Sequence, residues 1–188
     1  MRRLSHTIGF DDAPCAPDHR GDVAIVGAVF AGLRLEGVLH SHVRRDGANA
    51  TARLIDLVSR SRFGRQLQLV LLQGIAFAGF NVVDVEALHH TLGLPVLAVT
   101  RKRPRLERVR RALLAGRVPG GARKWRLIER LPPVEPAGEV FVQRIGVSAA
   151  DAGAIVRRLA VHGNVPEPLR TAHLIAGALG RGESRGRT

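Results

Sequence analysis

The run at residues 67–72, which is apolar except for Gln68, constrains the fold of this chain more than any other segment. A strand that is apolar on both faces must be covered on both sides, as happens when helices flank a parallel sheet. Residues 95–99 form a second run of this kind. Two such strands predict an α/β domain in which helices cover a sheet.

The N-terminal part of the chain predicts an antiparallel meander, because short segments of strand composition alternate there with turn residues. Three strands are expected, at residues 4–10, 23–33 and 38–43, with the last two joined as a hairpin near Glu36 and Gly37. Combined with the buried strands, the meander predicts a mixed sheet flanked by helices.

The rest of the chain alternates between helix and strand. Apolar residues at helical spacing predict helices at residues 49–62, 82–92 and 105–114, one that Ser148 opens, and one from Pro168 to about Leu179. Gly93 is expected to end the second of these helices. A weaker strand is expected at residues 140–143. We predict one domain over residues 1–180 and a disordered basic tail over residues 181–188.

The charge balance favours a phosphate-rich partner. Lys and Arg number 29 against 16 Asp and Glu, which gives a formal charge of +13. Binding phosphates releases counterions and so favours association. The alternative is a chain that uses Arg freely and leaves the charge solvated. Aromatic residues make up 4%, with no Tyr, which argues against the stacking platforms of single-strand binding modules.

Several classes of protein are disfavoured by what the sequence lacks. No apolar run is long enough for a membrane span, and the first residues do not resemble a signal peptide. A single cysteine, Cys15, excludes an internal disulfide. We therefore expect a cytoplasmic protein without a membrane partner.

Carboxylates stand near the ends of expected strands. Asp11 and Asp12 follow the first strand, Asp46 follows the third, and Asp84 follows the buried run and its Gly-bounded loop. Mg²⁺ takes oxygen ligands, usually one or two carboxylates plus substrate phosphate, so such residues could share an ion. Asp is also favoured at helix N-caps and in turns. The metal interpretation is preferred for Asp11 and Asp46, and both stay open for Asp12 and Asp84.

The histidines and glycines give weaker signals. His40 and His42 point to one face of their strand, but no zinc-ligand spacing accompanies them. No phosphate-binding loop, nucleophile elbow or dinucleotide fingerprint is present. The glycines that bound residues 74–79 would let the backbone approach a substrate, or would form a tight turn.

Five strings in the sequence resemble the endonuclease dU family, a relative of endonuclease V. They are IGFDD at residues 8–12, RDGANAT at 45–51, QGIAFAGFNVVD at 73–84, GLPVLAVTR at 93–101 and VPEPLRTAHLIA at 165–176. The resemblance extends from about Ser5 to Gly180. It implies an RNase H-like, endonuclease V-like fold. It also implies cleavage of DNA near a deaminated base, as a repair step that depends on Mg²⁺. Mn²⁺ as the ion and RNA as the substrate stay open as alternatives.

The resemblance also suggests roles for individual residues. Asp11 matches a first-strand metal ligand, Asp46 or Asn49 stands in place of a second acid, and Gln73 stands in place of a third. Arg101 matches a lysine that would contact phosphate, as Arg guanidinium groups do. The further candidates for nucleic-acid contact or for the site are Gly79, Asn81, Lys102, Arg105 and His173.

Two hypotheses follow. In the first, the chain is a metal-dependent endonuclease in which Asp11 and Asp46 hold the ion and Asp12 or Asp84 assists. In the second, it binds nucleic acid on the same fold without efficient cleavage, because Gln73 and Asn49 carry no negative charge. A third, weaker hypothesis is a small-molecule enzyme that uses His40 and His42.

Overall fold

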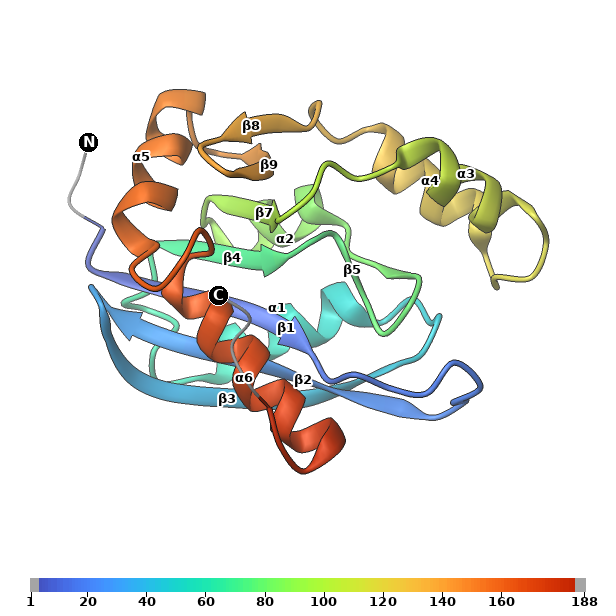
Figure 1. The fold of residues 1–188 in the computed structure, drawn as a ribbon, viewed down its shortest axis with the longest axis horizontal. Coiled ribbons are helices and arrows are strands. Elements are labelled where there is room, and N and C mark those ends of the chain that lie inside the picture. The colour runs from blue at the N-terminus through green and yellow to red at the C-terminus, as the bar shows by residue number, and fades with distance from the viewer. Residues whose placement is uncertain (1–3, 185–188) are drawn as a thin grey trace.

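The computed structural model describes residues 4–184, and they form a seven-stranded mixed sheet covered by helices (Figure 1). The strand order is β3-β2-β1-β4-β7-β9-β8. The strands are β1 (His6–Asp12), β2 (Asp22–Ala31), β3 (Arg34–Arg44), β4 (Leu69–Gln73), β7 (Val96–Thr100), β8 (Glu135–Ala137) and β9 (Val140–Ile145). The predicted mixed α/β sheet is therefore confirmed.

The parallel part of the sheet lies at its centre. β1 pairs in parallel with β4, and β4 with β7, whereas the outer pairs are antiparallel. The first four residues of β4 and of β7 are buried, as expected for strands covered on both faces. The two apolar runs of the sequence thus became neighbouring central strands.

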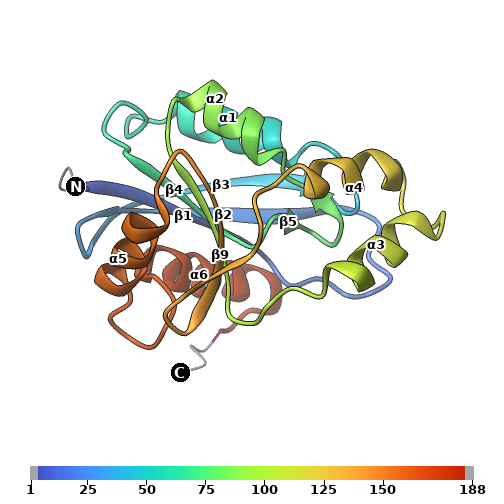
Figure 2. The same ribbon diagram turned by 90° about the horizontal axis from the view of Figure 1, so that it is seen from above.

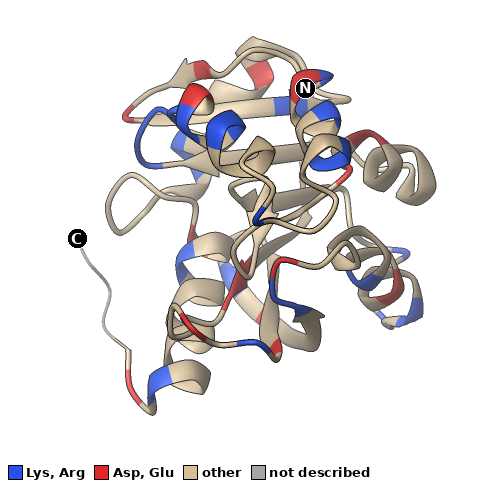
Figure 3. Cartoon of the chain, turned by 90° about the vertical axis from the view of Figure 1, so that its right-hand side faces the viewer, with Lys and Arg blue, Asp and Glu red and all other residues tan. Residues whose placement is uncertain are grey.

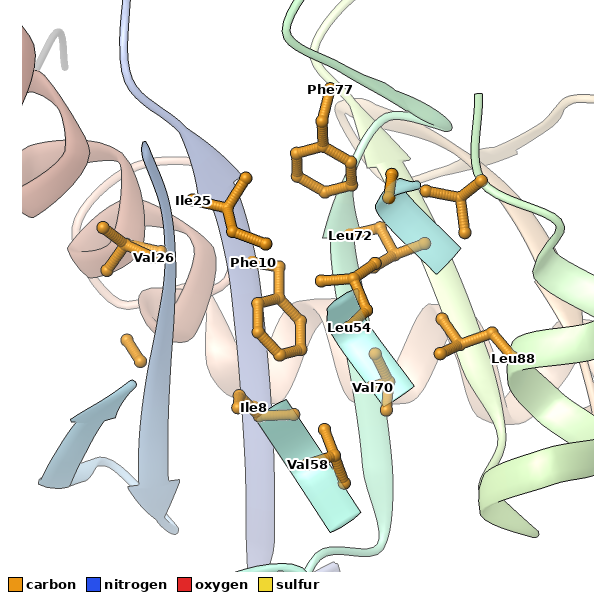
Figure 4. Close-up of a cluster of buried hydrophobic side chains, with 14 of the residues drawn as sticks. Ile8, Phe10, Ile25, Val26, Leu54, Val58, Val70, Leu72, Phe77 and Leu88 are labelled. Carbon is orange, nitrogen blue, oxygen red and sulfur yellow. The ribbon is translucent and has the colours of Figure 1, made fainter. Parts of the chain in front are cut away.

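Helices form a layer on each face of the sheet (Figure 2). Helices α1 (Ala50–Arg60) and α2 (Val85–Leu92) cover one face, and α5 (Ala149–Leu159) and α6 (Glu167–Arg181) cover the other. Figure 4 shows Leu54 and Val58 of α1 packed against Phe10 and Val70 of the central strands. Burial of these apolar faces fixes the helices on the sheet.

The predicted helix boundaries are confirmed where a capping residue marks them. Ser148 caps α5 by accepting a hydrogen bond from the Asp151 backbone N–H at 3.1 Å. Gly93 ends α2 with a φ of 65°. Pro168 lies in the first turn of α6. Local chemistry sets these positions, so local sequence is enough to find them.

The β2–β3 hairpin turns earlier than predicted. Ala31 pairs with Arg34, so the turn consists of Gly32 and Leu33 rather than Glu36 and Gly37. Gly32 has a φ of 61°, which suits a two-residue hairpin turn. A second difference is a small hairpin of β5 (Ala76–Phe77) and β6 (Asn81–Val82), which delays the start of α2 to Val85.

Two helices at one end of the molecule form a further unit. Helix α3 (Leu106–Leu114) was predicted, but the α4 helix (Gly121–Glu129) that packs on it was not. Its paired glycines and its Arg-rich sequence hide a helical pattern. The short edge strand β8, which contains Pro136, was missed as well.

The C-terminal part of α6 extends beyond the predicted end at Leu179 to Arg181. The hydroxyl of Ser184 then donates to the Leu174 carbonyl at 2.5 Å, so residues 182–184 fold back on the helix. The rest of the predicted tail, residues 185–188, lies outside the described residues. Within residues 4–184 no helix is long and apolar enough to cross a membrane.

Candidate active site

A cavity of about 910 Å³ opens where the parallel strands end and α6 crosses them. It is lined by Asp11, Asp12, Ala13, Pro14, Gln73, Arg101, Val165, Leu169, Arg170, His173, Gly177, Arg181, Glu183 and Ser184. Clefts at the carboxyl ends of sheet strands are the usual ligand sites of α/β folds. This cavity is therefore the candidate active site.

Strand register brings the first group of side chains together. Phe10 pairs with Leu72 in parallel register, so the next residues along, Asp11 and Gln73, are neighbours at the same edge of the sheet. Gln73 in turn pairs with Val99 on β7, two residues before Arg101. Three strand ends thus deliver a carboxylate, an amide and a guanidinium to one cavity.

Helix α6 supplies the second group, and Gly9 allows it to come close. A Cβ atom at Gly9 would lie 2.4 Å from the backbone carbon of Pro168, so any larger residue would push α6 away from β1. The cavity-lining residues Arg170, His173 and Gly177 are spaced by three and four positions, which places them on one face of the helix.

Asp11 and His173 form a short polar contact across the cavity lining. His173 Nδ1 lies 2.7 Å from Asp11 Oδ2, so the ring N–H donates to the carboxylate. The Asp11 side chain is 7% exposed and that of His173 is 52% exposed. The hydrogen bond to Asp11 raises the pKa of His173. Asp11 therefore fixes the orientation of the ring and favours its protonated form.

Asp12 also reaches the cavity but has a different environment. Its Oδ2 accepts a hydrogen bond from the backbone N–H of Ala78 at 2.8 Å. Burial, together with the charge of Asp11, raises the pKa of Asp12 to about 6, against the opposing effect of that hydrogen bond. Asp12 thus changes its charge at a mildly acidic pH.

The structure places Asp46 in a joint between loops rather than in the cavity lining. Its Oδ1 accepts from the Phe80 N–H at 2.8 Å, and its own N–H donates to the Ala78 carbonyl at 2.9 Å. Its carbonyl accepts from Lys124 Nζ at 2.6 Å. Gly79, with a φ of 84°, leaves room for the carboxylate, since a Cβ there would lie 2.4 Å from Asp46 Oδ1. Asp46 and Gly79 therefore hold the β5–β6 loop.

Asn49 and Asn81 form an amide pair behind that joint. Asn81 Nδ2 donates to Asn49 Oδ1 at 2.8 Å and to the Arg44 carbonyl at 2.9 Å. Asn81 Oδ1 accepts from the Ala50 N–H at 3.0 Å, and Asn81 is fully buried. These contacts start α1 and leave both amides outside the cavity lining.

Asp84 serves as the N-cap of α2. Its Oδ1 accepts from the Ala87 N–H at 3.0 Å, and its Oδ2 lies 3.5 Å from Arg130. Of the two interpretations left open for this residue, its contacts fit the helix cap. The expected convergence of Asp46 and Asp84 on Asp11 is thus not seen, because backbone N–H groups engage both carboxylates elsewhere. Any catalytic role of theirs stays a prediction.

The residues predicted to contact phosphate also divide into one that lines the cavity and others that lie outside it. Arg101 is exposed and lines the cavity, whereas Lys102 and Arg105 are exposed beyond its rim, on the way into α3. Four of the predicted residues besides Arg101 line the cavity, namely Asp11, Asp12, Gln73 and His173.

A family model for endonuclease dU matches residues 3–180. The chain belongs to the endonuclease dU family. A UPF0215 protein of Deinococcus radiodurans is 59% identical to this family member over 184 residues, covering 98% of the chain and 93% of the relative. The predicted family resemblance is confirmed.

Solved structures place the endonuclease dU fold beside that of endonuclease V. A crystal structure of a protein of unknown function from Archaeoglobus fulgidus matches with a TM-score of 0.86 and 30% identity, over 94% of this chain and 98% of that one. Endonuclease V of Ciona intestinalis, in complex with a DNA containing an inosine followed by a ribo-adenosine, matches with a TM-score of 0.58 and 14% identity, over 90% and 83%. The fold is RNase H-like, as predicted, and family and fold support a nucleic-acid endonuclease.

The donor set of this endonuclease dU family member fits an open, hydrated magnesium site. Asp11 and Asp12 offer carboxylate oxygens and Gln73 an amide oxygen to one cavity. Within residues 4–184 no group of three or more His, Cys, Asp or Glu side chains could hold a metal ion. Mg²⁺ commonly keeps several waters and takes only one or two carboxylates. The cavity therefore suits an ion completed by water and phosphate, not a closed protein cage.

Sequence reasoning missed two arginines and one glutamate of the cavity. Arg170, Arg181 and Glu183 line it, and the first two share a helix face with His173. A signal was present, because Arg170 and Arg181 stand three positions before and eight positions after His173. Selecting His173 as a candidate and then reading its helix face would have found both arginines.

Proposed function

We propose that this protein is a Mg²⁺-dependent endonuclease that cuts DNA beside a deaminated base of the deoxyuridine type, as a step of DNA repair. The observation that carries the proposal is the meeting of Asp11, Gln73 and Arg101 in one cavity at the ends of three parallel strands. Membership of the endonuclease dU family supports the same reaction class.

Asp11 and Gln73 would hold the ion, with Asp12 as a second carboxylate. Asp11 already accepts hydrogen bonds from His173 and from the Asp12 N–H, but each carboxylate oxygen keeps a further lone pair. When bound, Mg²⁺ would activate a water and stabilise the oxygen that leaves the phosphodiester.

His173 would handle a proton at the scissile phosphate. Its Nδ1–H is held by Asp11, so its Nε2 is the ring atom available to a substrate. The raised pKa of His173 favours the imidazolium, which can donate a proton to a leaving oxygen.

Arg101, Arg170 and Arg181 would bind the strand on either side of the cut. Their guanidinium groups line the cavity from two directions, from the end of β7 and from α6. Planar guanidinium groups suit phosphate recognition because they donate two parallel hydrogen bonds.

The test is an incubation of the purified protein with labelled oligonucleotides that carry uracil, hypoxanthine or no lesion, in Mg²⁺, Mn²⁺ or chelator. We expect metal-dependent nicking of a lesion strand and a loss of at least about 100-fold in Asp11→Ala, since the ion serves the chemical step. The matched control is Asp56→Ala on α1, which removes a carboxylate outside the cavity. Full activity in Asp11→Ala would exclude the proposal.

A second candidate is a protein that binds nucleic acid on this fold without cutting it. It is favoured by Gln73, which offers no negative charge where the resemblance implies an acid. Gln73→Asp separates the two candidates, since a third carboxylate should strengthen Mg²⁺ binding and raise nicking about tenfold. Salt-sensitive binding with no nicking by either form, under any metal, would establish the second candidate.

A further inference from the structure

One segment of 30 residues carries most of the charge of the molecule. Residues 101–130, named here the basic arm, contain 12 Lys or Arg and 2 Glu. Its formal charge is +10, against +13 for the whole chain. The remaining residues are close to neutral, so the excess charge belongs to a single region.

The cations of the basic arm face solvent. Eleven of the twelve are exposed, the exception being Lys124. Within the described part of the chain, only Arg110 and Arg130 among the twelve form an ion pair with a carboxylate. Charge that is neither buried nor neutralised locally creates a positive potential at the surface.

The helices of the basic arm arrange these cations in two stripes. Leu113 of α3 and Ile128 of α4 are buried between the helices and the β5–β6 hairpin. The exposed sides carry Arg108 and Arg111 on α3, with Arg105 directly before it, and Arg123 and Arg126 on α4, with Arg130 directly after it. Spacings of three and four residues keep each set on one side of its helix. Figure 3 views the molecule from the end where these helices lie, and blue segments gather there.

A buried lysine fixes the basic arm to the rest of the protein. Lys124 is 4% exposed, and its Nζ donates to the Asp46 carbonyl at 2.6 Å. Asp46 also binds Ala78, whose N–H donates to Asp12 in the candidate active site. The arm is therefore held at a defined position relative to the cavity.

The basic arm is continuous with the cavity. Arg101, its first residue, lines the cavity, and Lys102 and Arg103 lead from there to α3. Figure 1 shows α3 and α4 beyond the carboxyl ends of β4 and β7. A long polyanion that enters the cavity can therefore reach the stripes of the arm.

We propose that the basic arm binds the phosphate backbone of a nucleic-acid duplex that flanks the strand held in the cavity; this rests on the proposed function. Arginines at regular spacing match a repeating polyanion and carry no sequence preference. The single aromatic residue of the arm, Trp125, lies under Arg110 at 5.9 Å rather than open to a base. Single-strand binding relies on such stacking, so a duplex is the better fit.

The test measures the salt dependence of binding to a lesion-free duplex of about 25 base pairs, between about 50 and 200 mM salt. The arm variant combines Arg108→Gln, Arg111→Gln, Arg123→Gln and Arg126→Gln. The control variant combines Arg53→Gln, Arg60→Gln, Arg65→Gln and Arg157→Gln, which are exposed outside the arm and remove the same charge. If the arm variant does not fold, two double variants replace it. One changes Arg108 and Arg111 on α3, and the other changes Arg123 and Arg126 on α4.

The arm variant should bind about 100-fold more weakly, and its slope of log affinity against log salt should be smaller by about 3. The control variant should stay near the wild type, and each double variant should lose about half of the slope change. Equal loss in the arm and control variants would overturn the inference, because net charge alone would then explain it. Tighter binding of a single strand, or arm-dependent binding to phosphatidylglycerol vesicles without duplex binding, would also overturn it.

The same proteins distinguish this inference from the proposed function. Duplex binding that depends on the arm, in a protein that never nicks, would keep the inference and remove the nuclease. If the wild type nicks and the arm variant binds and cuts equally well, the nuclease proposal would stand and the inference about the arm would fail. Asp11→Ala should bind the lesion-free duplex with the wild-type salt slope, because it leaves the arm intact.

Discussion

Two pairs of carboxylates with similar surroundings in the sequence have different roles in the structure. Asp11 and Asp12 end a central strand and reach the cavity. Asp46 and Asp84 also follow strands, but neither lines the cavity, and their oxygens accept hydrogen bonds from the Phe80 and Ala87 N–H groups. The first pair is placed where a substrate can come, and the second pair holds loops and helix ends.

The position of the parent strand explains the difference. β1 lies at the centre of the sheet beside β4, so its last residues open into the space under α6. β3 is an edge strand, and β2 separates it from β1, which amounts to about 10 Å at the usual strand spacing. A carboxylate after β3 must cross that distance to join Asp11, and Asp46 instead contacts the nearer β5–β6 loop.

The largest change in stability is expected from Asp46→Ala. It removes a charged acceptor from the Phe80 N–H and weakens the joint with Ala78, so the free energy of unfolding should fall by about 2–3 kcal/mol. Asp46→Asn keeps an acceptor oxygen and should lose less than half of that. Urea unfolding with chelator present measures both. If Asp46→Ala unfolds like the wild type, the distinction between the two pairs fails for this residue.

Asp12→Asn should raise the free energy of unfolding rather than lower it, and the size of the gain should depend on pH. The pKa of Asp12 in the folded protein is about 6, above the ordinary value of 3.8, so the ionised carboxylate costs stability once the pH exceeds both values. The asparagine variant should therefore match the wild type near pH 4. It should become more stable between pH 4 and 6, by about 2 kcal/mol at pH 8, allowing for partial exposure. The asparagine can still accept from the Ala78 N–H.

Denaturant unfolding of the metal-free proteins at several pH values measures this difference. The expected result is a stability gain that appears with rising pH and then levels off. A gain that is the same at pH 4 and pH 8 would mean that the charge of Asp12 is not its cause. The ionised carboxylate of Asp12 would then carry no free-energy cost.

Sequence alone was sufficient for the central part of this picture. The apolar runs located β4 and β7, and the end of the first strand located Asp11. Gln73 and Arg101 came from the family strings, and they lie at the ends of β4 and β7. These assignments succeeded because a parallel sheet aligns its strand ends, whatever the loops between them do. The His173 candidate came from a family string, since nothing local marks a helix residue as part of a cavity.

The loops could not be predicted in the same way. The contact between Lys124 and the Asp46 carbonyl joins positions that are 78 residues apart. Helix α4, which carries this lysine, starts after a Gly residue and is rich in Arg and Lys. No local rule links a lysine on such a segment to an aspartate after an edge strand. The structural role of Asp46 could therefore not be predicted from the sequence.

The smallest effect is expected from Asp84→Ala, which tests the simplest member of the second pair. The change removes the N-cap hydrogen bond to Ala87 and should lower the free energy of unfolding by about 1 kcal/mol. The exposed pair with Arg130 should add little, because surface ion pairs contribute little in water. Asp84→Asn, which is an equally good cap, should stay within a few tenths of a kcal/mol. If nicking instead falls as far in Asp84→Asn as in Asp11→Ala while the free energy of unfolding is unchanged, Asp84 acts in catalysis. It then belongs with Asp11 and Asp12 rather than with Asp46.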